Sequence, residues 1–149
     1  MVIEVLHLNL VSPLFYFPEE NPQPFHYPGD GPLEGTAEEK LFCFELEERV
    51  YRHFEPNKEK LIKALIFGGT YAGPNPEQKG GMEGLLELPA GNYLFAQKRQ
   101  LLDRESILFM AGEIQSEALW QRLKPGKKLY LRYLHEDNSM VTQLFRTIE

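Results

Sequence analysis

The chain has 149 residues, of which 42% are hydrophobic and 12% aromatic, so we expect one domain over residues 1–149 that fills its core without disulfides or metal. The net charge of −6 argues against a general nucleic-acid-binding protein, and the single cysteine, Cys43, excludes an intrachain disulfide and favours a reducing compartment. The sequence shows neither a leader nor an apolar run of the roughly 20 residues that a membrane helix needs, so we expect a cytoplasmic protein without a membrane partner.

Charge is distributed unevenly along the chain. Residues 1–57 hold eleven acids and three bases, a net −8, whereas residues 58–149 hold eleven acids and thirteen bases, a net +2. Five bases lie close together, at Arg122, Lys124, Lys127, Lys128 and Arg132. They indicate either a solvated helix end, where cations suit the helix dipole, or a site for an anionic partner.

The N-terminal part alternates between hydrophobic and polar residues. Residues 2–10 have the two-residue period of a half-buried strand, which residues 14–17 extend after Pro13. Residues 18–35 hold five prolines and three glycines, which exclude a helix or an inner strand, together with aromatic residues. This segment is either a loop that packs back on the body over a pocket or a disordered connection.

Residues 36–54 carry conflicting signals. Residues 36–39 match a helix capping box, and Phe42, Leu46, Val50 and Phe54 are four residues apart, which suits a helix face. The same stretch also shows strand parity and β-favouring residues, which tilt the prediction to a strand over roughly 41–53 after a short helical turn, with a second strand at about 60–67. Residues 68–76 are rich in glycine and proline and are predicted to form a turn. They lack the Gly-Lys-Ser/Thr ending of a phosphate-binding loop, and residues 82–88 begin the next strand.

In the last part of the sequence all local signals agree. The motif Leu-Pro-Ala-Gly-Asn-Tyr at residues 88–93 indicates a kinked strand, after which Tyr93, Phe95 and Gln97 face one side. A helix over about residues 103–123 begins at its N-cap Asp103, carries one apolar stripe and ends before the Pro-Gly pair at 125–126. Alternating strands follow at residues 128–136 and 141–148, joined by a hairpin turn at 137–139.

This motif, followed by a helix and a hairpin, resembles the second half of the gyrase-inhibitor-like (GyrI-like) family, which includes the effector-binding domains of bacterial multidrug-responsive regulators. The resemblance covers about residues 60–149. It implies an α+β fold: a curved antiparallel sheet of two β-α-β-β-type repeats, here about residues 1–78 and 79–149, with one long helix at about 103–123 packed on it. The first repeat is degenerate, since no clear helix lies between residues 10 and 36. Members bind small molecules, often cationic or aromatic, in the cleft between the repeats.

The resemblance predicts a small-molecule-binding protein without a DNA-binding region of its own. The candidate ligand-binding residues are aromatic side chains near the sheet and one acid as counter-charge for a cation: Tyr93, Phe95, Trp120, Tyr130, Tyr133 and Glu136. The strand at residues 128–134 lacks the glutamate that family members commonly carry there. No metal site or cofactor is predicted, because His7, His26, His53 and His135 are isolated in the sequence.

Two other functions fit the sequence. An acidic N-terminal half suits a protein-interaction or inhibitor module with a basic partner, on which the Pro-rich loop would order. Some members of the resembling family are small hydrolases that use a glutamate and an aromatic hydroxyl, and five glutamates on expected strands are available: Glu45, Glu47, Glu48, Glu87 and Glu136. No catalytic residue is assigned, because neither a Ser-His-Asp set nor an activated-cysteine context is present.

Overall fold

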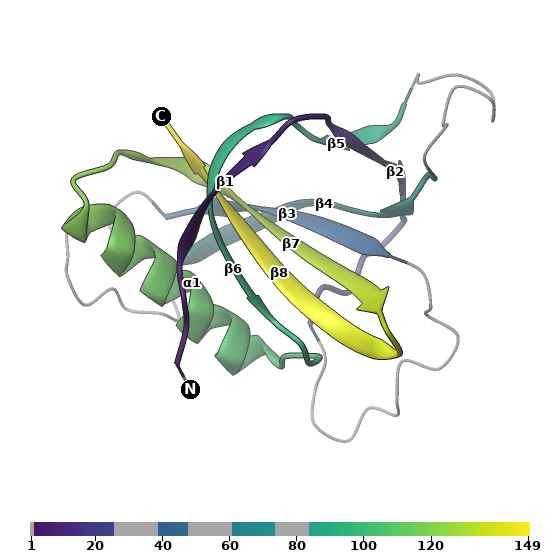
Figure 1. Cartoon of the computed structure of the whole chain (residues 1–149). Helices are drawn as coiled ribbons and strands as arrows, with labels where there is room; N and C mark the ends of the chain where they lie inside the picture. Colours follow the sequence, from purple (N-terminus) through teal and green to yellow (C-terminus); the bar gives the residue numbers. More distant parts are fainter. Residues whose placement is uncertain (1, 26–38, 48–60, 74–83) are drawn as a thin grey trace.

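The computed structural model describes residues 2–25, 39–47, 61–73 and 84–149. These residues form one curled antiparallel sheet of eight strands with one helix packed on it (Figure 1). In chain order the elements are β1 (Leu6–Leu10), β2 (Leu14–Pro18), β3 (Lys40–Leu46), β4 (Ile62–Tyr71), β5 (Leu86–Leu88), β6 (Gly91–Lys98), α1 (Arg104–Trp120), β7 (Pro125–Glu136) and β8 (Ser139–Ile148). The predicted curved antiparallel sheet and its packed helix are confirmed, and the fold is mostly β.

The strand order across the sheet is β1-β6-β8-β7-β3-β4-β2-β5. This order is symmetrical about its centre, because exchanging β1, β2, β3 and β4 with β5, β6, β7 and β8 maps every pairing onto another that the sheet contains. The centre lies between β3 and β7, which pair from Lys40 opposite Tyr133 to Glu45 opposite Lys128. α1 occupies the connection between β6 and β7, and residues 26–38 of the corresponding connection lie outside the described residues.

Two successive strand pairs form one bent ribbon that reaches from one edge of the sheet to the other. β1 pairs with β6 up to Leu10 opposite Gly91, and β2 pairs with β5 from Leu14 opposite Leu88, with a register shift of one residue between them. The predicted kink at residues 89–91 is confirmed, since Pro89 separates β5 from β6 and Gly91 has φ +147°. Figure 1 shows the ribbon arching over the sheet.

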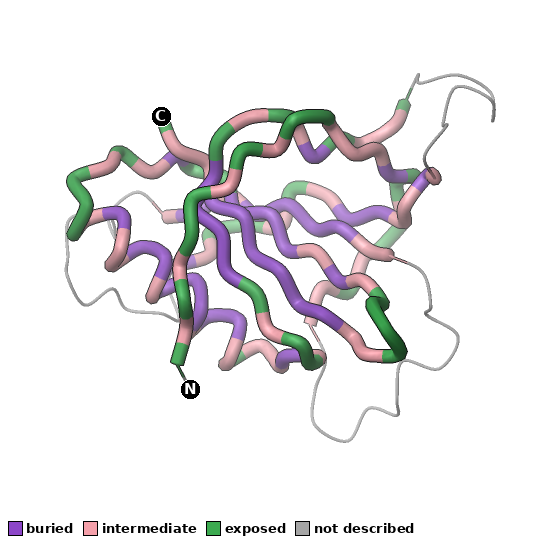
Figure 2. The backbone as a smooth tube through the Cα atoms, in the orientation of Figure 1, coloured by how far each residue is buried: buried purple, intermediate pink, exposed green. Residues whose placement is uncertain are grey.

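Alternation along the strands divides the core into two faces. The helix face holds the buried side chains that pack with α1: Phe42, Phe44, Leu46, Leu61, Leu94, Ala96, Leu102, Ile107, Met110, Ala111, Ile114, Ala118, Leu129, Leu131, Tyr133 and Leu144. The inner face, on the inside of the curl, holds a second buried set: Tyr16, Leu41, Cys43, Leu88, Tyr93, Phe95, Tyr130 and Phe145. The central strands, which contribute to both sets, are the most continuously buried part of the chain (Figure 2).

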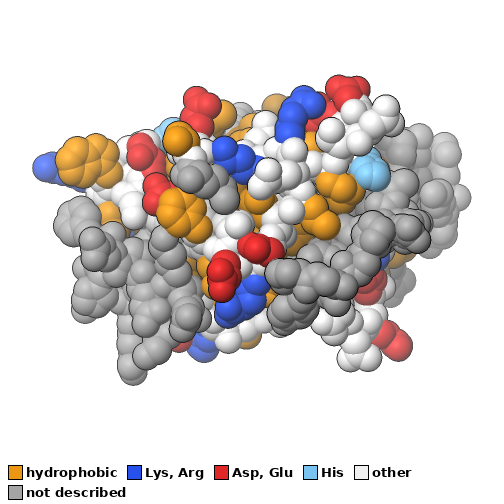
Figure 3. All heavy atoms as spheres, turned by 90° about the horizontal axis from the view of Figure 1, so that it is seen from below, with side chains coloured by type: hydrophobic (Ala, Val, Ile, Leu, Met, Phe, Trp, Pro, Cys, Tyr) orange, Lys and Arg blue, Asp and Glu red, His pale blue; other side chains and the backbone are white. Residues whose placement is uncertain are grey.

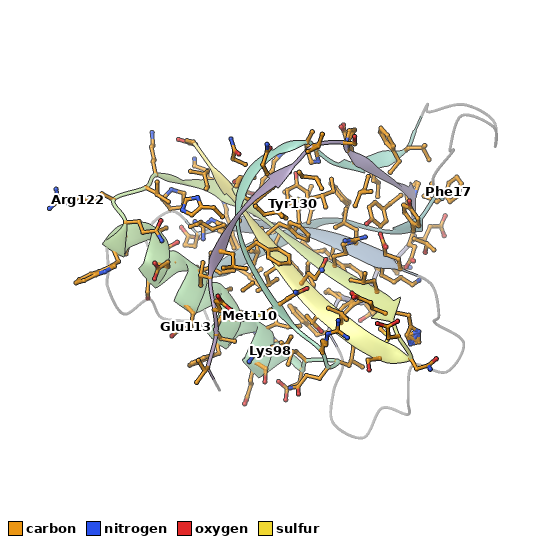
Figure 4. All side chains as sticks on the ribbon, in the orientation of Figure 1. Phe17, Lys98, Met110, Glu113, Arg122 and Tyr130 are labelled. Atoms are coloured by element: carbon orange, nitrogen blue, oxygen red, sulfur yellow. The ribbon has the colours of Figure 1, made fainter. Side chains whose placement is uncertain are left out.

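The start of α1 is as the sequence predicts. Asp103 is the N-cap, and its carboxylate accepts a hydrogen bond from the Ser106 amide at 2.8 Å. This hydrogen bond lowers the pKa of the Asp103 carboxyl. The apolar stripe faces the sheet, and Figure 4 shows Met110 pointing from α1 toward the strands. No helix in the described part of the chain is both long and apolar enough to cross a membrane.

The predicted end of the helix is wrong, because α1 ends at Trp120 rather than at residue 123. Arg122 adopts a left-handed conformation with φ +57°, and the Leu123 amide donates to the Ala118 carbonyl at 2.9 Å. These two features form a Schellman ending, which Arg122 achieves without the usual glycine. Pro125, half of the predicted stop signal, instead begins β7.

The ambiguous segment is a strand where it is described. β3 spans Lys40–Leu46, whereas residues 36–38 and 48–60 lie outside the described residues. The predicted turn from residue 68 is wrong at its start, since β4 continues to Tyr71. Its glycines serve close packing instead. A Cβ on Gly68 would clash with the Pro22 side chain and lie 2.8 Å from the Phe42 ring, and one on Gly69 would lie 2.6 Å from the Phe17 carbonyl oxygen.

The remaining strand predictions are largely confirmed. β1 begins at Leu6, later than the predicted residue 2, and β2 corresponds to the extension after the proline. Of the strand predicted at 82–88, residues 86–88 form β5, residues 84 and 85 precede it, and residues 82 and 83 lie outside the described residues. The C-terminal hairpin closes through a two-residue turn in which Asp137 and Asn138 have φ of +50° and +64°, values typical of the type I′ turn that suits twisted strands.

The described start of the Pro-rich segment packs on the body of the protein. The Phe25 ring stacks on Phe44 with centroids 5.6 Å apart, and the Arg104 guanidinium lies 5.9 Å from the Phe25 ring centroid. The Pro24 carbonyl accepts a hydrogen bond from the Tyr133 hydroxyl at 2.7 Å. These contacts cover the helix face and not the inner face, and residues 26–35 of the segment lie outside the described residues.

Candidate functional site

The inner face brings together aromatic rings from strands that are not neighbours. The Tyr93 ring on β6 meets the Tyr130 ring on β7 edge to face at 6.2 Å, and the Phe67 ring on β4 lies 6.4 Å from Tyr130. Phe145 lies 5.7 Å from the Tyr93 ring and 5.0 Å from Phe95. Phe145 lies on β8, next to β6, whereas the curl of the sheet brings the Tyr93 and Phe67 rings to Tyr130 across an intervening strand. We call the five residues the aromatic cluster, and Figure 4 shows Tyr130 beneath the arch of the ribbon.

Three of the six predicted ligand-binding residues lie in this cluster. Tyr93 and Phe95 face the inner side of β6, as their parity predicts, and Tyr130 faces them from β7. All three are buried, and their neighbours are each other's rings. Edge-to-face pairs of this kind add stability beyond the burial of area, so in the described state the rings form a packed core.

The structure does not bring the other three predicted residues to the cluster. Tyr133 is on the helix face, because it lies three residues after Tyr130 on an alternating strand. Trp120 is 78% exposed at the end of α1. Glu136 is at the exposed end of β7, where it pairs with Arg99 at 3.1 Å.

A row of five polar side chains crosses the inner face beside the aromatic cluster. Its members are Gln97 on β6, Gln143 on β8, Arg132 on β7, Glu39 immediately before β3, and Tyr16 on β2. The Arg132 guanidinium donates to Glu39 at 2.8 Å and to Gln143 at 3.0 Å, and the Gln143 amide donates to Gln97 at 3.0 Å. The Tyr16 hydroxyl donates to the second oxygen of Glu39. We call this set the polar row.

The register of the sheet places the members of the polar row side by side. Gln143 pairs directly with Gln97 on one side and with Arg132 on the other. Arginine only donates hydrogen bonds, so the Gln143 carbonyl oxygen must face Arg132 and its amide nitrogen must face Gln97. The Gln97 carbonyl oxygen then accepts, which leaves the Gln97 amide hydrogens toward the exposed end of the row. Arg132 therefore fixes the orientation of both amides.

The charged pair in the middle of the row is largely removed from water. The side chains of Arg132 and Glu39 are 17% and 14% exposed. Burial by itself would lower the pKa of Arg132, but interactions with Glu39 and Tyr16, of which the hydrogen bond to Glu39 is the largest, outweigh it and raise the pKa above its ordinary value. Burial also raises the pKa of Tyr16, so its hydroxyl stays protonated as a donor to Glu39.

One donor of the polar row has no partner among the described residues. The Nε–H of Arg132 is buried and makes no hydrogen bond there, although the Tyr16 hydroxyl lies close to the guanidinium. The other two guanidinium nitrogens are bonded to Glu39 and Gln143. A buried donor without an acceptor costs about 1–3 kcal/mol, more for a charged group, so such groups in folded proteins call for an explanation.

Cys43 and Tyr130 form a second polar contact on the inner face. They lie directly opposite each other on β3 and β7, and their side chains are hydrogen-bonded. Burial raises the pKa of the Cys43 thiol to about 11 and that of Tyr93 to about 12, and it also raises the pKa of Tyr130. These groups are neutral at pH 7, so Cys43 lacks the thiolate character of a catalytic nucleophile.

The described surface offers little evidence for other kinds of site. On the face seen in Figure 3, acidic, basic and hydrophobic side chains are interspersed among the described atoms. Of the five clustered bases, Arg132 is held in the polar row and Lys124 pairs with Glu149 at 3.1 Å. Across the described ranges, no three His, Cys, Asp or Glu side chains gather in a way that could hold a metal ion.

Sequence reasoning missed four members of the polar row. Arg132 was grouped with the surface bases, although its parity with Tyr130 placed it on the inner face, and Gln143 likewise shares parity with Phe145. Parity was thus the available signal for these two. Glu39 and Tyr16 carried no such signal, because their partners are distant in the sequence.

Comparison with protein-family models, with curated proteins and with solved structures finds no match to this chain.

Proposed function

We propose that this protein binds a small molecule at the inner face, where the polar row meets the aromatic cluster. The observation that carries the proposal is the buried Arg132–Glu39 pair with its flanking amides. Ligand sites combine apolar and aromatic walls with a few fixed polar groups, and the inner face has this composition.

Stability alone gives a weak reason for a buried charged pair. Removing two charges from water costs several kcal/mol, and well-packed hydrophobic residues of similar size are often equally or more stabilising. Here Arg132 lies opposite the buried Leu41 on β3 and two residues after the buried Tyr130 on the same face of β7, so an apolar side chain would also fit the pattern at this position. A role in recognition gives such a pair a function that apolar residues could not supply.

The architecture supports the same proposal. We infer that the chain consists of two β-α-β-β-type halves, as the resemblance to the gyrase-inhibitor-like family implies, because the strand order is symmetrical about β3 and β7. Ligands of that family occupy the cleft between the halves. In this chain Cys43, Tyr130 and Arg132 lie on the two strands that meet at the centre. The polar row crosses this centre and joins strands of both halves.

Binding to a fragment library would test the proposal. Two-dimensional ¹H–¹⁵N NMR spectra of the protein, recorded with cationic, anionic and neutral aromatic fragments, should show shifts at Arg132, Gln143 and Gln97. The double variant Arg132→Met/Glu39→Leu should abolish the shifts. The double variant Arg99→Gln/Glu136→Gln, which removes an exposed pair of the same chemistry, should retain them. If no fragment class perturbs the polar row, the proposal is wrong.

The other two functions have weaker support in the described residues. Two of the N-terminal acids already have partners, since Glu19 pairs with Lys40 and Glu39 with Arg132. That leaves less negative charge for a basic protein partner. A hydrolase would need a carboxylate held beside a substrate. Of the glutamates available for that role, Glu136 pairs with Arg99 and Glu45 with Lys63 at exposed positions, Glu87 is exposed, and Glu48 lies outside the described residues.

A further inference from the structure

We infer that the ligand of the polar row is an uncharged, planar aromatic molecule that carries a carbonyl group or an equivalent hydrogen-bond acceptor. This inference rests on the proposed function and adds the chemical class of the ligand. Three observations lead to it: the unpartnered donor on Arg132, the cancellation of charge within the row, and the rings beside it.

The unpartnered group is a donor, so it selects an acceptor. Arg132 has no acceptor capacity, and its Nε is the one guanidinium nitrogen without a hydrogen bond to the described part of the chain. The orientation of Gln143 and Gln97 leaves amide hydrogens toward the exposed end of the row. A ligand with one acceptor at Arg132 and a second polar atom near Gln97 would satisfy both. A ligand with only donor groups would leave the buried Nε–H unpaired.

The charges of the row cancel, so it favours a neutral ligand. Arg132 and Glu39 are its only charged members, and they are bonded to each other. An ammonium group placed at Arg132 would meet a guanidinium, and a carboxylate placed there would share it with Glu39 at the cost of repulsion between two buried anions. Two further charges act on the inner face, Lys128 near Cys43 and Glu87 near Tyr93, and they are exposed and of opposite sign. The cationic preference implied by the family resemblance therefore finds no electrostatic support here.

The surroundings of Arg132 favour a flat, aromatic body for the ligand. Tyr130 lies two residues before Arg132 on the same face of β7, and Phe145 lies opposite Tyr130 on β8. Side chains at these positions are neighbours along and across the strands. A ligand ring that enters beside the row would contact Tyr130 and Phe145. These contacts would replace some of those that the two rings now make within the aromatic cluster.

A matched series of ligands separates the three possible charge classes. We would measure binding of 2-naphthamide, 2-naphthoate and 2-naphthylmethylammonium to the full chain by isothermal titration calorimetry and by ¹H–¹⁵N NMR. The naphthalene ring is constant, so the comparison reports on the polar group. We expect the amide to bind about ten times more tightly than either charged analogue, a difference of about 1.4 kcal/mol. The strongest shift should occur at the Arg132 side-chain Nε–H.

Two variants link the result to the proposed donor. In Arg132→Lys the positive charge remains but the planar fork and its Nε–H are lost, so the preference for the amide should fall to less than threefold. Arg99→Lys makes the same change at an exposed pair and should leave the preference unaltered. Because Arg132→Lys tests a buried site, its near-ultraviolet circular dichroism should first be shown to match the parent protein.

Failure of this inference is distinguishable from failure of the proposed function. If the ammonium or the carboxylate binds at the polar row as tightly as the amide, the neutral ligand class is wrong and the binding function stands. If the amide binds tightly but shifts only residues outside the row, both the ligand contact and the site are wrong. If none of the three ligands and no library fragment perturbs the row, the binding function itself is refuted.

Discussion

Replacing Arg132 by methionine would remove the only cation that faces Glu39 within the polar row. The two side chains are 17% and 14% exposed and their nearest polar atoms lie 2.8 Å apart, so the carboxylate would stay buried without a counter-charge. The Gln143 carbonyl oxygen would also lose its donor. Methionine fills much of the arginine stem's volume, so the change acts chiefly on charge and hydrogen bonding.

The expected loss follows from these contacts. Breaking a buried ion pair by removing one partner costs about 3–5 kcal/mol. We therefore expect Arg132→Met to lower the free energy of unfolding by about 4 kcal/mol. Changing Glu39→Leu in the same chain removes the stranded carboxylate, and the remaining loss should be about 1–2 kcal/mol, from hydrogen bonds that Tyr16 and Gln143 no longer make. The double variant should thus be more stable than the single one.

Urea denaturation followed by far-ultraviolet circular dichroism would measure these differences, provided that the slope of the transition is unchanged between variants. The exposed Arg99–Glu136 pair is the matched control, since its side chains are 60% and 47% exposed, and Arg99→Met should cost about 0.5 kcal/mol or less. If the double variant is as unstable as Arg132→Met, the loss comes from packing and the reasoning from an unpaired charge is refuted.

Three further predictions use other parts of the structure. Burial raises the pKa of Tyr93 to about 12, against about 10 in an unfolded chain, so the stability that its neutral hydroxyl contributes is complete below pH 10 and is lost as pH rises toward 12. Absorbance at 295 nm, which reports tyrosine ionisation, should then rise together with the loss of circular dichroism. The difference from Tyr93→Phe isolates the contribution of Tyr93, and its ionisation near pH 10 in a protein that is still folded would contradict the prediction. Gly68→Ala should lower the free energy of unfolding by about 2 kcal/mol, because the added methyl group would overpack against Pro22 and Phe42. Gly84→Ala, in open space at φ +79°, should cost about 1 kcal/mol, and equal losses in urea denaturation would argue against close packing at Gly68. Asp103→Ala should cost about 1 kcal/mol by loss of the N-cap, while Asp103→Asn should keep most of the stability, so similar losses would exclude the capping role.

The C-terminal half could be predicted because its determinants are local. The N-cap at Asp103, the two-residue turn at Asp137 and the alternation along β7 and β8 each involve residues close in sequence. The end of α1 was predicted incorrectly. The Pro-Gly pair at 125–126 is a strong local stop signal, but the helix ends earlier, at the left-handed backbone of Arg122. A non-glycine residue at positive φ gives no reliable signal in the sequence.

The N-terminal half and the candidate site depend on contacts between distant segments. Gly68 and Gly69 are turn signals locally, whereas in the structure they pair with β3 and β2 from distant parts of the chain. The bent ribbon pairs residues about 80 apart in sequence. The sequence therefore indicates a break at Pro13 and a kink at Pro89, but it does not indicate that the strands around these two prolines pair with each other. The aromatic cluster could be predicted only in part, because parity identified which side Tyr93 faces but not that Tyr130 on β7 and Phe145 on β8 would contact it.

The polar row also bears on how the sheet chooses its register. Side chains alternate with a period of two, so a slip of one residue in β7 would move Arg132 from the inner face to the helix face. There it would meet the apolar side of α1, including Ile107 and Met110, with no carboxylate among the described side chains of that cluster. Burying Arg132 on the helix face without a counter-charge would therefore disfavour the wrong register, whether or not a ligand binds. A stability measurement on Arg132 variants alone can therefore be explained by register specificity, and only the ligand series, in which the fold is constant, tests recognition.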